Sequence, residues 1–179
     1  MTKIFIDSGH GGENPGAIAA SGLKESDVTL DIGLRLGRLL KASGYEVKYS
    51  RESDIAVTLA ERARLANDWG ADYFISIHCN SNPDPAYKGT STYCFKLGIT
   101  AAVLAKYINT ALVEAIGTLD LGVMTANFAV LRRTQMPAVL VETAFLSNPE
   151  EAALLAEPVF REKCAQGIAN GINEFINAQ

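Results

Sequence analysis

The sequence predicts a single α/β domain over residues 1–179, with a mainly parallel, twisted sheet of about six strands flanked by helices on both faces. Short apolar segments alternate along the chain with longer segments in which apolar residues recur at helical spacing. The segments at 4–6, 73–77 and 138–141 are almost continuously apolar, which is typical of parallel strands covered on both sides. A length of 179 residues is enough for one domain with a sizeable core.

Strands and helices are expected to alternate through the N-terminal half of the chain. A β-branched and aromatic run that begins at Lys3 stops at glycines, as a buried strand would. A helical pattern then begins beside Ser26 and ends at Gly44. The next expected elements are an alternating strand over 45–50, a helix that Thr58 caps and Gly70 ends, and the apolar strand over 73–77.

The C-terminal half begins with a predicted strand over 90–95, which could run antiparallel to its neighbours. A helix capped by Thr100 is expected to end near Gly117, and residues 118–128 show no regular pattern. After them the sequence predicts a short strand over 129–131, an apolar strand over 137–142, a helix that begins with Asn148 and Pro149, and a last helix from about Pro158.

Composition and charge argue against several classes of protein. The formal net charge is −4 and no block of lysine or arginine is present, so we expect no nucleic-acid partner. No apolar run approaches the ~20 residues of a membrane span, and a strand so close to Met1 predicts that no signal peptide is present. Cys79, Cys94 and Cys164 have unrelated spacings, so we expect buried, unpaired thiols.

The two histidines of the chain stand in similar places. His10 and His78 each follow an apolar strand, and Glu142 ends a third such strand. Ligands of parallel α/β sheets bind beyond the carboxyl ends of the strands, so these three side chains can converge. Glu25 lies at the end of a glycine-rich loop that leaves the same edge, and it can reach the same spot.

Two neutral imidazoles and one carboxylate around an open position form a catalytic zinc site. Zinc lowers the pKa of a water in the open position from 15.7 to about 7, and a further carboxylate is needed to accept the proton. Glu25 and Glu142 are the two well-placed acids, and the residues alone leave open which of them binds metal. A pair of hydrogen-bonded surface histidines is the alternative interpretation.

Several segments, in this order, resemble a known family, the zinc-dependent N-acetylmuramoyl-L-alanine amidases of type 3. These bacterial and phage enzymes cut peptidoglycan. The similarity extends over essentially the whole chain. The segments are Asp7-Ser8-Gly9-His10-Gly11-Gly12, Gly22-Leu23-Lys24-Glu25, Ser50-Arg51 with Asp54 and Leu59-Ala60-Glu61-Arg62, Ser76-Ile77-His78-Cys79-Asn80-Ser81, and Pro137-Ala138-Val139-Leu140-Val141-Glu142 with Phe145-Leu146-Ser147-Asn148-Pro149-Glu150.

The resemblance implies that residues 1–179 are a catalytic domain that binds one Zn²⁺ through His10, Glu25 and His78, with Glu142 as the catalytic acid/base. It also implies the reaction, which is hydrolysis of the amide between the lactyl group of N-acetylmuramic acid and the L-alanine of the stem peptide. The implied partner is peptidoglycan and the implied location is extracellular or in the cell wall. We expect a monomer, which in a longer protein could be fused to wall-binding repeats.

Other polar residues near these motifs are candidates for supporting roles. Asp7, Ser76 and Asn80 could orient the histidines, and Arg51 and Arg132 could contact substrate carboxylates. Hydrogen bonding within loops, or to solvent, is the alternative role for each.

The family often carries a helical insertion that covers the site. Segments 80–89 and 118–127 are too short for such an insertion, so we expect an open site.

Two rival functions remain at this stage. One is a different zinc hydrolase, such as a wall peptidase or a deacetylase. The other is a non-catalytic wall-binding module, which would be expected to show repeats or rows of exposed aromatic residues. The sequence shows neither of these features.

Overall fold

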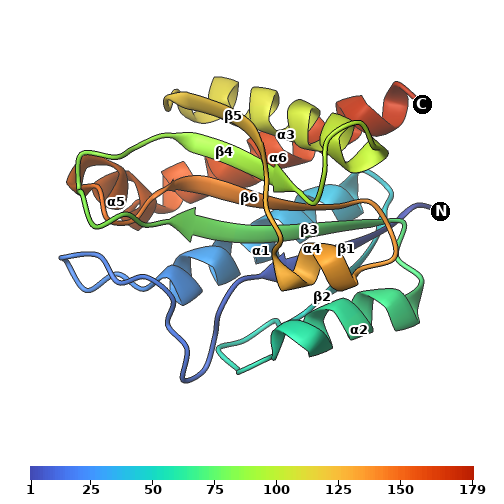
Figure 1. Cartoon of the computed structure of the whole chain (residues 1–179), viewed down its shortest axis with the longest axis horizontal. Coiled ribbons are helices and arrows are strands. Elements are labelled where there is room, and N and C mark those ends of the chain that lie inside the picture. The colour runs from blue at the N-terminus through green and yellow to red at the C-terminus, as the bar shows by residue number, and fades with distance from the viewer.

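One six-stranded sheet runs through the computed structural model, which describes residues 1–179 (Figure 1). Its strands are β1 (Lys3–Ser8), β2 (Glu46–Tyr49), β3 (Tyr73–Asn80), β4 (Thr90–Cys94), β5 (Asp120–Thr125) and β6 (Ala138–Phe145). They lie in the order β2-β1-β3-β6-β4-β5. The first four of these run parallel, whereas β4 is antiparallel to β6 and parallel to β5. The mainly parallel sheet and the antiparallel strand near residues 90–95 are therefore confirmed.

Six helices accompany the sheet, namely α1 (Glu25–Ala42), α2 (Leu59–Trp69), α3 (Thr100–Ile116), α4 (Ala129–Arg133), α5 (Pro149–Ala156) and α6 (Pro158–Asn177). Helices α1, α3 and α6 pack on one face, while α2 and α4 lie on the other (Figure 1). The predicted cover of helices on both faces is thus confirmed.

The two faces of the sheet have cores of unequal size. On the side of α1, α3 and α6, 27 buried residues form the larger core, and Ile75 and Ile77 of β3 point into it. On the side of α2 and α4 the core has only 8 buried residues, including Phe74. Since side chains alternate along a strand, Ser76 and His78 lie on the same face as Phe74. His78 therefore projects on the more thinly covered face, at the end of its strand.

The predicted strand over 129–131 is wrong. These residues begin α4, and Val130 and Leu131 pack into the smaller core. A run of three apolar residues is too short to distinguish a strand from one turn of helix. The strand of this region is β5, within the segment that showed no regular pattern. It lies at the sheet edge and includes Gly122 at a φ of 78°, so it has little strand-like patterning.

Local capping agrees with the sequence at two helices and differs at two others. At the start of α5 the Asn148 side chain accepts a hydrogen bond from the Glu151 amide, as predicted. The Thr58 hydroxyl accepts a hydrogen bond from the Glu61 amide at the start of α2, as predicted. Thr100 is instead the first residue of α3, and no side chain caps that helix. Helix α1 begins at Glu25, one residue before Ser26.

The three cysteines have the environment that their spacing predicted. Cys79, Cys94 and Cys164 are free and buried. None of the helices combines the length and apolar character that a membrane span requires.

Candidate metal centre

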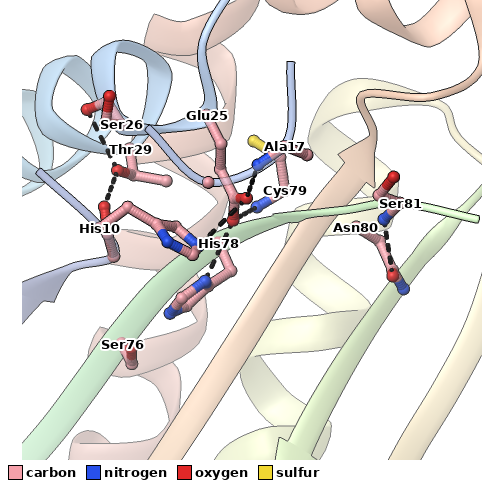
Figure 2. A network of polar contacts seen from close by, with 12 residues as sticks. His10, Ala17, Glu25, Ser26, Thr29, Ser76, His78, Cys79, Asn80 and Ser81 are labelled. Atoms are coloured by element: carbon pink, nitrogen blue, oxygen red, sulfur yellow. Dashed lines mark hydrogen bonds and ion pairs between the residues drawn. The ribbon is translucent and has the colours of Figure 1, made fainter. Parts of the chain in front are cut away.

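Four chemically reactive side chains meet at the carboxyl edge of the parallel strands. His78 near the end of β3 and Glu142 in β6 are register partners on neighbouring strands. His10 follows β1, which pairs with β3 on its other side. Glu25 is the first residue of α1 and extends toward both imidazoles (Figure 2). The convergence expected from three strand ends and one loop is therefore present.

The carboxylate of Glu25 lies between the two histidines. Its Oε2 is 3.1 Å from His10 Nε2, and its Oε1 is 3.0 Å from His78 Nδ1. Backbone amides fix the same two oxygens, because Ala17 donates to Oε2 at 2.9 Å and Cys79 donates to Oε1 at 3.0 Å (Figure 2). The carboxylate thus keeps its orientation through contacts with the chain itself.

His10 is held in an unusual backbone conformation. Its φ is 62°, and it is the only residue other than glycine with a positive φ. A left-handed conformation costs roughly 1–2 kcal/mol for a residue with a Cβ. Arg62 offsets this cost by donating to the His10 carbonyl at 2.6 Å, and both Arg62 and Arg51 donate to the Ser8 carbonyl. The strained turn therefore aims the imidazole at Glu25.

Asn14 determines the tautomer of His10. Its Oδ1 accepts a hydrogen bond from the Gly16 amide at 3.1 Å, which identifies this side-chain atom as the oxygen. The same oxygen lies 3.1 Å from His10 Nδ1, so a neutral imidazole carries its proton there. His10 Nε2 is then left with a lone pair that faces the Glu25 carboxylate. Two electron-rich atoms facing each other at this distance favour a cation between them.

Electrostatics also favour an ionised carboxylate at the centre. Burial would raise the pKa of Glu25, but when the two rings are protonated, their hydrogen bonds to Glu25 and their charges outweigh burial. They hold the pKa well below its usual range. Burial would lower the pKa of His78, yet the hydrogen bond with Glu25 and the nearby carboxylates raise it. The site is therefore complementary to positive charge.

Glu142 has a different environment from Glu25. Burial, with a smaller effect from the Glu25 charge, raises its pKa to about 7, although His78 and His10 oppose the shift. Its Oε2 atom is buried without a hydrogen-bond partner. An acid with a pKa near neutrality can both accept and donate a proton at physiological pH.

The donor set suits a zinc ion. One atom from each of His10, Glu25 and His78 can be chosen so that all three lie within 4.8 Å of one another. Two imidazole nitrogens and one carboxylate oxygen are a ligand set of catalytic zinc sites, which leave a fourth position open. Close packing also depends on two glycines. A Cβ on Gly16 would lie 2.5 Å from Glu25 Oε2, and one on Gly9 would lie 2.6 Å from His78 Nε2.

None of the three residues expected to orient the histidines forms a hydrogen bond with an imidazole ring. Asp7 pairs with Arg62 at 2.8 Å and accepts from the Ser76 hydroxyl at 2.8 Å, but neither bonds to a histidine ring. Asn80 accepts from the Ser81 amide instead of holding an imidazole (Figure 2).

The two arginines expected to meet substrate have other partners. Arg51 is buried and donates to the carbonyls of Ser8, Gly9 and Ser26. Arg132 lies in α4 and donates to Asn127. Arg51 therefore stabilises the loop that carries His10.

Asn14 and Arg62 support the site although neither was predicted from the sequence to do so. Arg62 is only 3% exposed. The sequence does indicate that Arg62 is buried, because it precedes Ala66 by four residues and so lies on the apolar face of α2. A charged residue on such a face usually has a buried partner.

Comparisons with known proteins agree with this geometry. Residues 4–174 match the family described as N-acetylmuramoyl-L-alanine amidase. The sporulation-specific N-acetylmuramoyl-L-alanine amidase of Bacillus subtilis is 39% identical over 99% of this chain and 69% of its own length. The N-acetylmuramoyl-L-alanine amidase AmiC of Neisseria meningitidis is 35% identical over 97% of this chain, which spans about half (52%) of that protein.

Solved structures extend the similarity to the fold. The catalytic domain of CwlV, an N-acetylmuramoyl-L-alanine amidase from Bacillus (Paenibacillus) polymyxa, superposes with a TM-score of 0.94. The sequences are 35% identical, and the superposition covers 100% of both chains. The six-stranded sheet and its flanking helices are therefore those of an amidase catalytic domain.

Proposed function

The chain belongs to the N-acetylmuramoyl-L-alanine amidase family, whose enzymes hydrolyse peptidoglycan, and from this premise we propose the catalytic role of each site residue. His10, Glu25 and His78 hold one zinc ion, and Glu142 transfers the proton. The bond cleaved is the amide between the lactyl group of N-acetylmuramic acid and the L-alanine of the stem peptide.

The zinc site supplies Lewis-acid activation of water and of the scissile carbonyl. The chain's own residues prepare the site for this role. Asn14 keeps the Nε2 lone pair of His10 directed at the centre, and the amides of Ala17 and Cys79 hold Glu25 in place. Because these contacts already exist within the chain, binding requires little rearrangement.

Glu142 acts as general base and then as general acid. Its carboxylate accepts a proton from the attacking water, and its carboxylic acid then delivers that proton to the departing alanine nitrogen. A pKa of about 7 suits both steps, because neither protonation state is strongly favoured at neutral pH. Its position beside His78, on the neighbouring strand, puts it next to the metal centre.

One observation carries the proposal. Side chains from positions 10, 25 and 78 present two imidazoles and an ionised carboxylate within 4.8 Å, and a second carboxylate with a raised pKa lies on the adjacent strand. This arrangement is the one that zinc-dependent amide hydrolysis needs.

The product spectrum from purified peptidoglycan tests the reaction. We expect released stem peptide with a new alanine amino terminus, unshortened and without free acetate, and no release after chelation. A shortened peptide would indicate a peptidase, and acetate would indicate a deacetylase.

Variants test the assigned roles. Glu142→Gln should abolish turnover while retaining about one zinc per chain, because the amide cannot exchange the proton. His10→Ala and His78→Ala should lose zinc and activity together. Stoichiometric zinc in either histidine variant would remove that residue from the ligand set.

The proposed location of the enzyme follows from where its substrate occurs. We propose that the chain acts as a monomer outside the cell or within the wall, where peptidoglycan is accessible. Loop segments 81–89 and 126–128 are short, which leaves the metal edge of the sheet without a covering helix and supports an uninhibited enzyme.

A further inference from the structure

Two buried polar atoms belong to residues that lie opposite each other beside the metal centre. Strands β4 and β6 run side by side (Figure 1), and Ser91 of β4 is the register partner of Glu142 of β6. The hydroxyl oxygen of Ser91 and Oε2 of Glu142 are both buried without a hydrogen-bond partner. Only three side-chain atoms of the chain share this condition, so two of the three belong to a single cross-strand pair.

The register puts both side chains on the face of the sheet that carries the site. Directly opposed residues of an antiparallel pair point to the same face, with Cβ atoms about 4.5–5.5 Å apart. Glu142 is also the register partner of His78, so Ser91, Glu142 and His78 form one row across β4, β6 and β3. Rotation about side-chain bonds can therefore bring the hydroxyl to the carboxylate without movement of the backbone.

The surroundings of Ser91 offer its hydroxyl no alternative across the sheet. Its register partner on the other side is Gly122 of β5, which has no side chain. The neighbouring hydroxyls of Thr90 and Thr92 already donate to other acceptors. Ser91 is 0% exposed, so solvent does not satisfy it. Because an unsatisfied buried polar group is costly, a bond between the two unpartnered atoms is favoured.

Glu142 also lacks the support that the other groups of the site receive. Two backbone amides hold Glu25, and Asn14 holds His10, whereas Oε2 of Glu142 has no partner. A general base must lie within hydrogen-bond reach of the proton that it accepts. Misplacement of a catalytic group by about 1 Å can cost ~100-fold in rate. The orientation of this carboxylate therefore needs a further contact.

We propose that Ser91 is a positioning residue for the acid/base, an assignment that rests on the proposed function. Its hydroxyl donates to Oε2 of Glu142, and this bond fixes the carboxylate so that its other oxygen faces the metal centre. Hydrogen bonds from a hydroxyl to a carboxylate are short and roughly twice as strong as those between neutral groups. One oxygen of Glu142 thus serves orientation, and the other serves proton transfer.

Ser91→Ala tests the role by removing the hydroxyl with little change in volume. Zinc-loaded protein acting on a soluble N-acetylmuramoyl-pentapeptide should lose about tenfold or more in kcat, because its acid/base is no longer oriented. KM and zinc content should stay unchanged, since Ser91 contacts neither substrate nor metal. Ser91→Thr keeps the hydroxyl and should restore most of kcat.

Ser50→Ala is the matched control. The Ser50 hydroxyl is the third buried atom without a partner, and Ser50 follows β2, at the opposite edge of the sheet from β4 and β5. Removing an unsatisfied buried hydroxyl relieves a desolvation cost, so this variant should be at least as stable as wild type and equally active. If Ser91 were an unpaired hydroxyl of the same kind, Ser91→Ala would be equally silent.

An infrared measurement supplies a readout that does not depend on turnover. The difference between the spectra of wild type and Glu142→Gln identifies the carboxyl band of Glu142. Ser91→Ala should shift that band, and Ser50→Ala should leave it in place.

Three results would overturn the role of Ser91 while leaving the amidase function intact. They are wild-type kcat in Ser91→Ala, an unshifted band in that variant, and a folded, zinc-loaded Ser91→Thr protein that is as slow as Ser91→Ala. Absence of stem-peptide release by the wild-type chain would instead overturn the proposed function, and the role of Ser91 with it.

Discussion

A single methyl group at Gly9 should disable the metal centre. Gly9 follows β1 and has no positive φ, so its backbone accepts alanine without strain. A Cβ there would lie 2.6 Å from Nε2 and 2.7 Å from Nδ1 of His78. Ordinary van der Waals contact begins at 3.4 Å, so the imidazole of the Gly9→Ala variant must retreat from its place beside Glu25.

The size of the effect follows from this displacement. Zinc–nitrogen bonds are held near 2.0–2.1 Å, so a ring that shifts by a large part of an ångström loses its bond to the metal. Displacements of about 1 Å in a catalytic group can cost ~100-fold in rate. We therefore expect Gly9→Ala to fold, to bind zinc substoichiometrically, and to lose at least about 100-fold in kcat/KM.

Gly22→Ala provides the control for this experiment. Gly22 has a φ of 90°, and a Cβ there would meet nothing within 4 Å. The control variant should therefore lose roughly 1–2 kcal/mol of unfolding free energy through backbone strain, yet keep its zinc and its activity. Of the two variants, Gly22→Ala would thus have the more strained backbone and also the higher activity.

The assay combines zinc analysis, thermal unfolding and hydrolysis of peptidoglycan for both variants. Gly9→Ala with one zinc per chain and wild-type turnover would refute the reasoning, because His78 could not then occupy the position described above. Loss of activity with full zinc content would place the damage outside the ligand set and would equally contradict it.

Three further predictions concern the surroundings of the ligands. Asn14→Ala should weaken zinc affinity ~10–100-fold, because the His10 tautomer is no longer fixed; competition with a chelator measures this, and unchanged affinity would exclude the role. Arg62→Met should destabilise the fold by roughly 3–5 kcal/mol by leaving Asp7 unpaired, which lowers Tm by about 6–20 °C; a smaller loss would mean that Asp7 finds another partner. In metal-free protein, the pKa of Glu142 lies near 7, above its ordinary 4.5, so its contribution to stability is present below about pH 4.5 and is lost as pH rises through 7. Urea unfolding should therefore show Glu142→Gln matching wild type at pH 4 and exceeding it at pH 8, and equal stability at pH 8 would contradict the raised pKa.

The convergence of distant residues was predictable from the sequence because of one topological rule. His10 follows β1, His78 lies near the end of β3, and Glu142 ends the apolar run of β6, although that strand continues to Phe145. Parallel strands bring such positions to one edge of the sheet. Glu25 could be added because its loop leaves and returns at that edge. The convergence of these four side chains thus depends on the direction of the strands, which the apolar runs indicate.

The contacts that orient these residues were not predictable in the same way. Arg62 and Arg51 bind main-chain carbonyls, and every residue offers such an acceptor, so no sequence spacing marks the partner. The left-handed φ of His10 depends on those contacts. Asn14 belongs to a glycine-rich loop whose path only the folded chain defines. For the same reason Arg51 seemed available to substrate although it is buried.

At the edge of the sheet, the pattern of apolar residues does not predict the secondary structure correctly. β6 is buried along most of its length, and its first four residues, 138–141, form a continuous apolar run. β5 has one neighbour, β4, and is only half-buried, so nothing requires it to be apolar. Residues 129–131 are apolar because α4 covers the smaller core. In both cases burial in the folded protein, more than local secondary-structure propensity, determines which residues are apolar.

The hydrogen bonds that the Ala17 and Cys79 amides donate to Glu25 have a consequence for how the proposed enzyme acquires its ion. They tie the glycine-rich loop, the start of α1 and the end of β3 together through contacts within the chain itself. Maturation can then be a simple loading event on an already folded scaffold. Apoprotein prepared by chelation should keep its native circular dichroism spectrum and recover on adding zinc, without passage through denaturant.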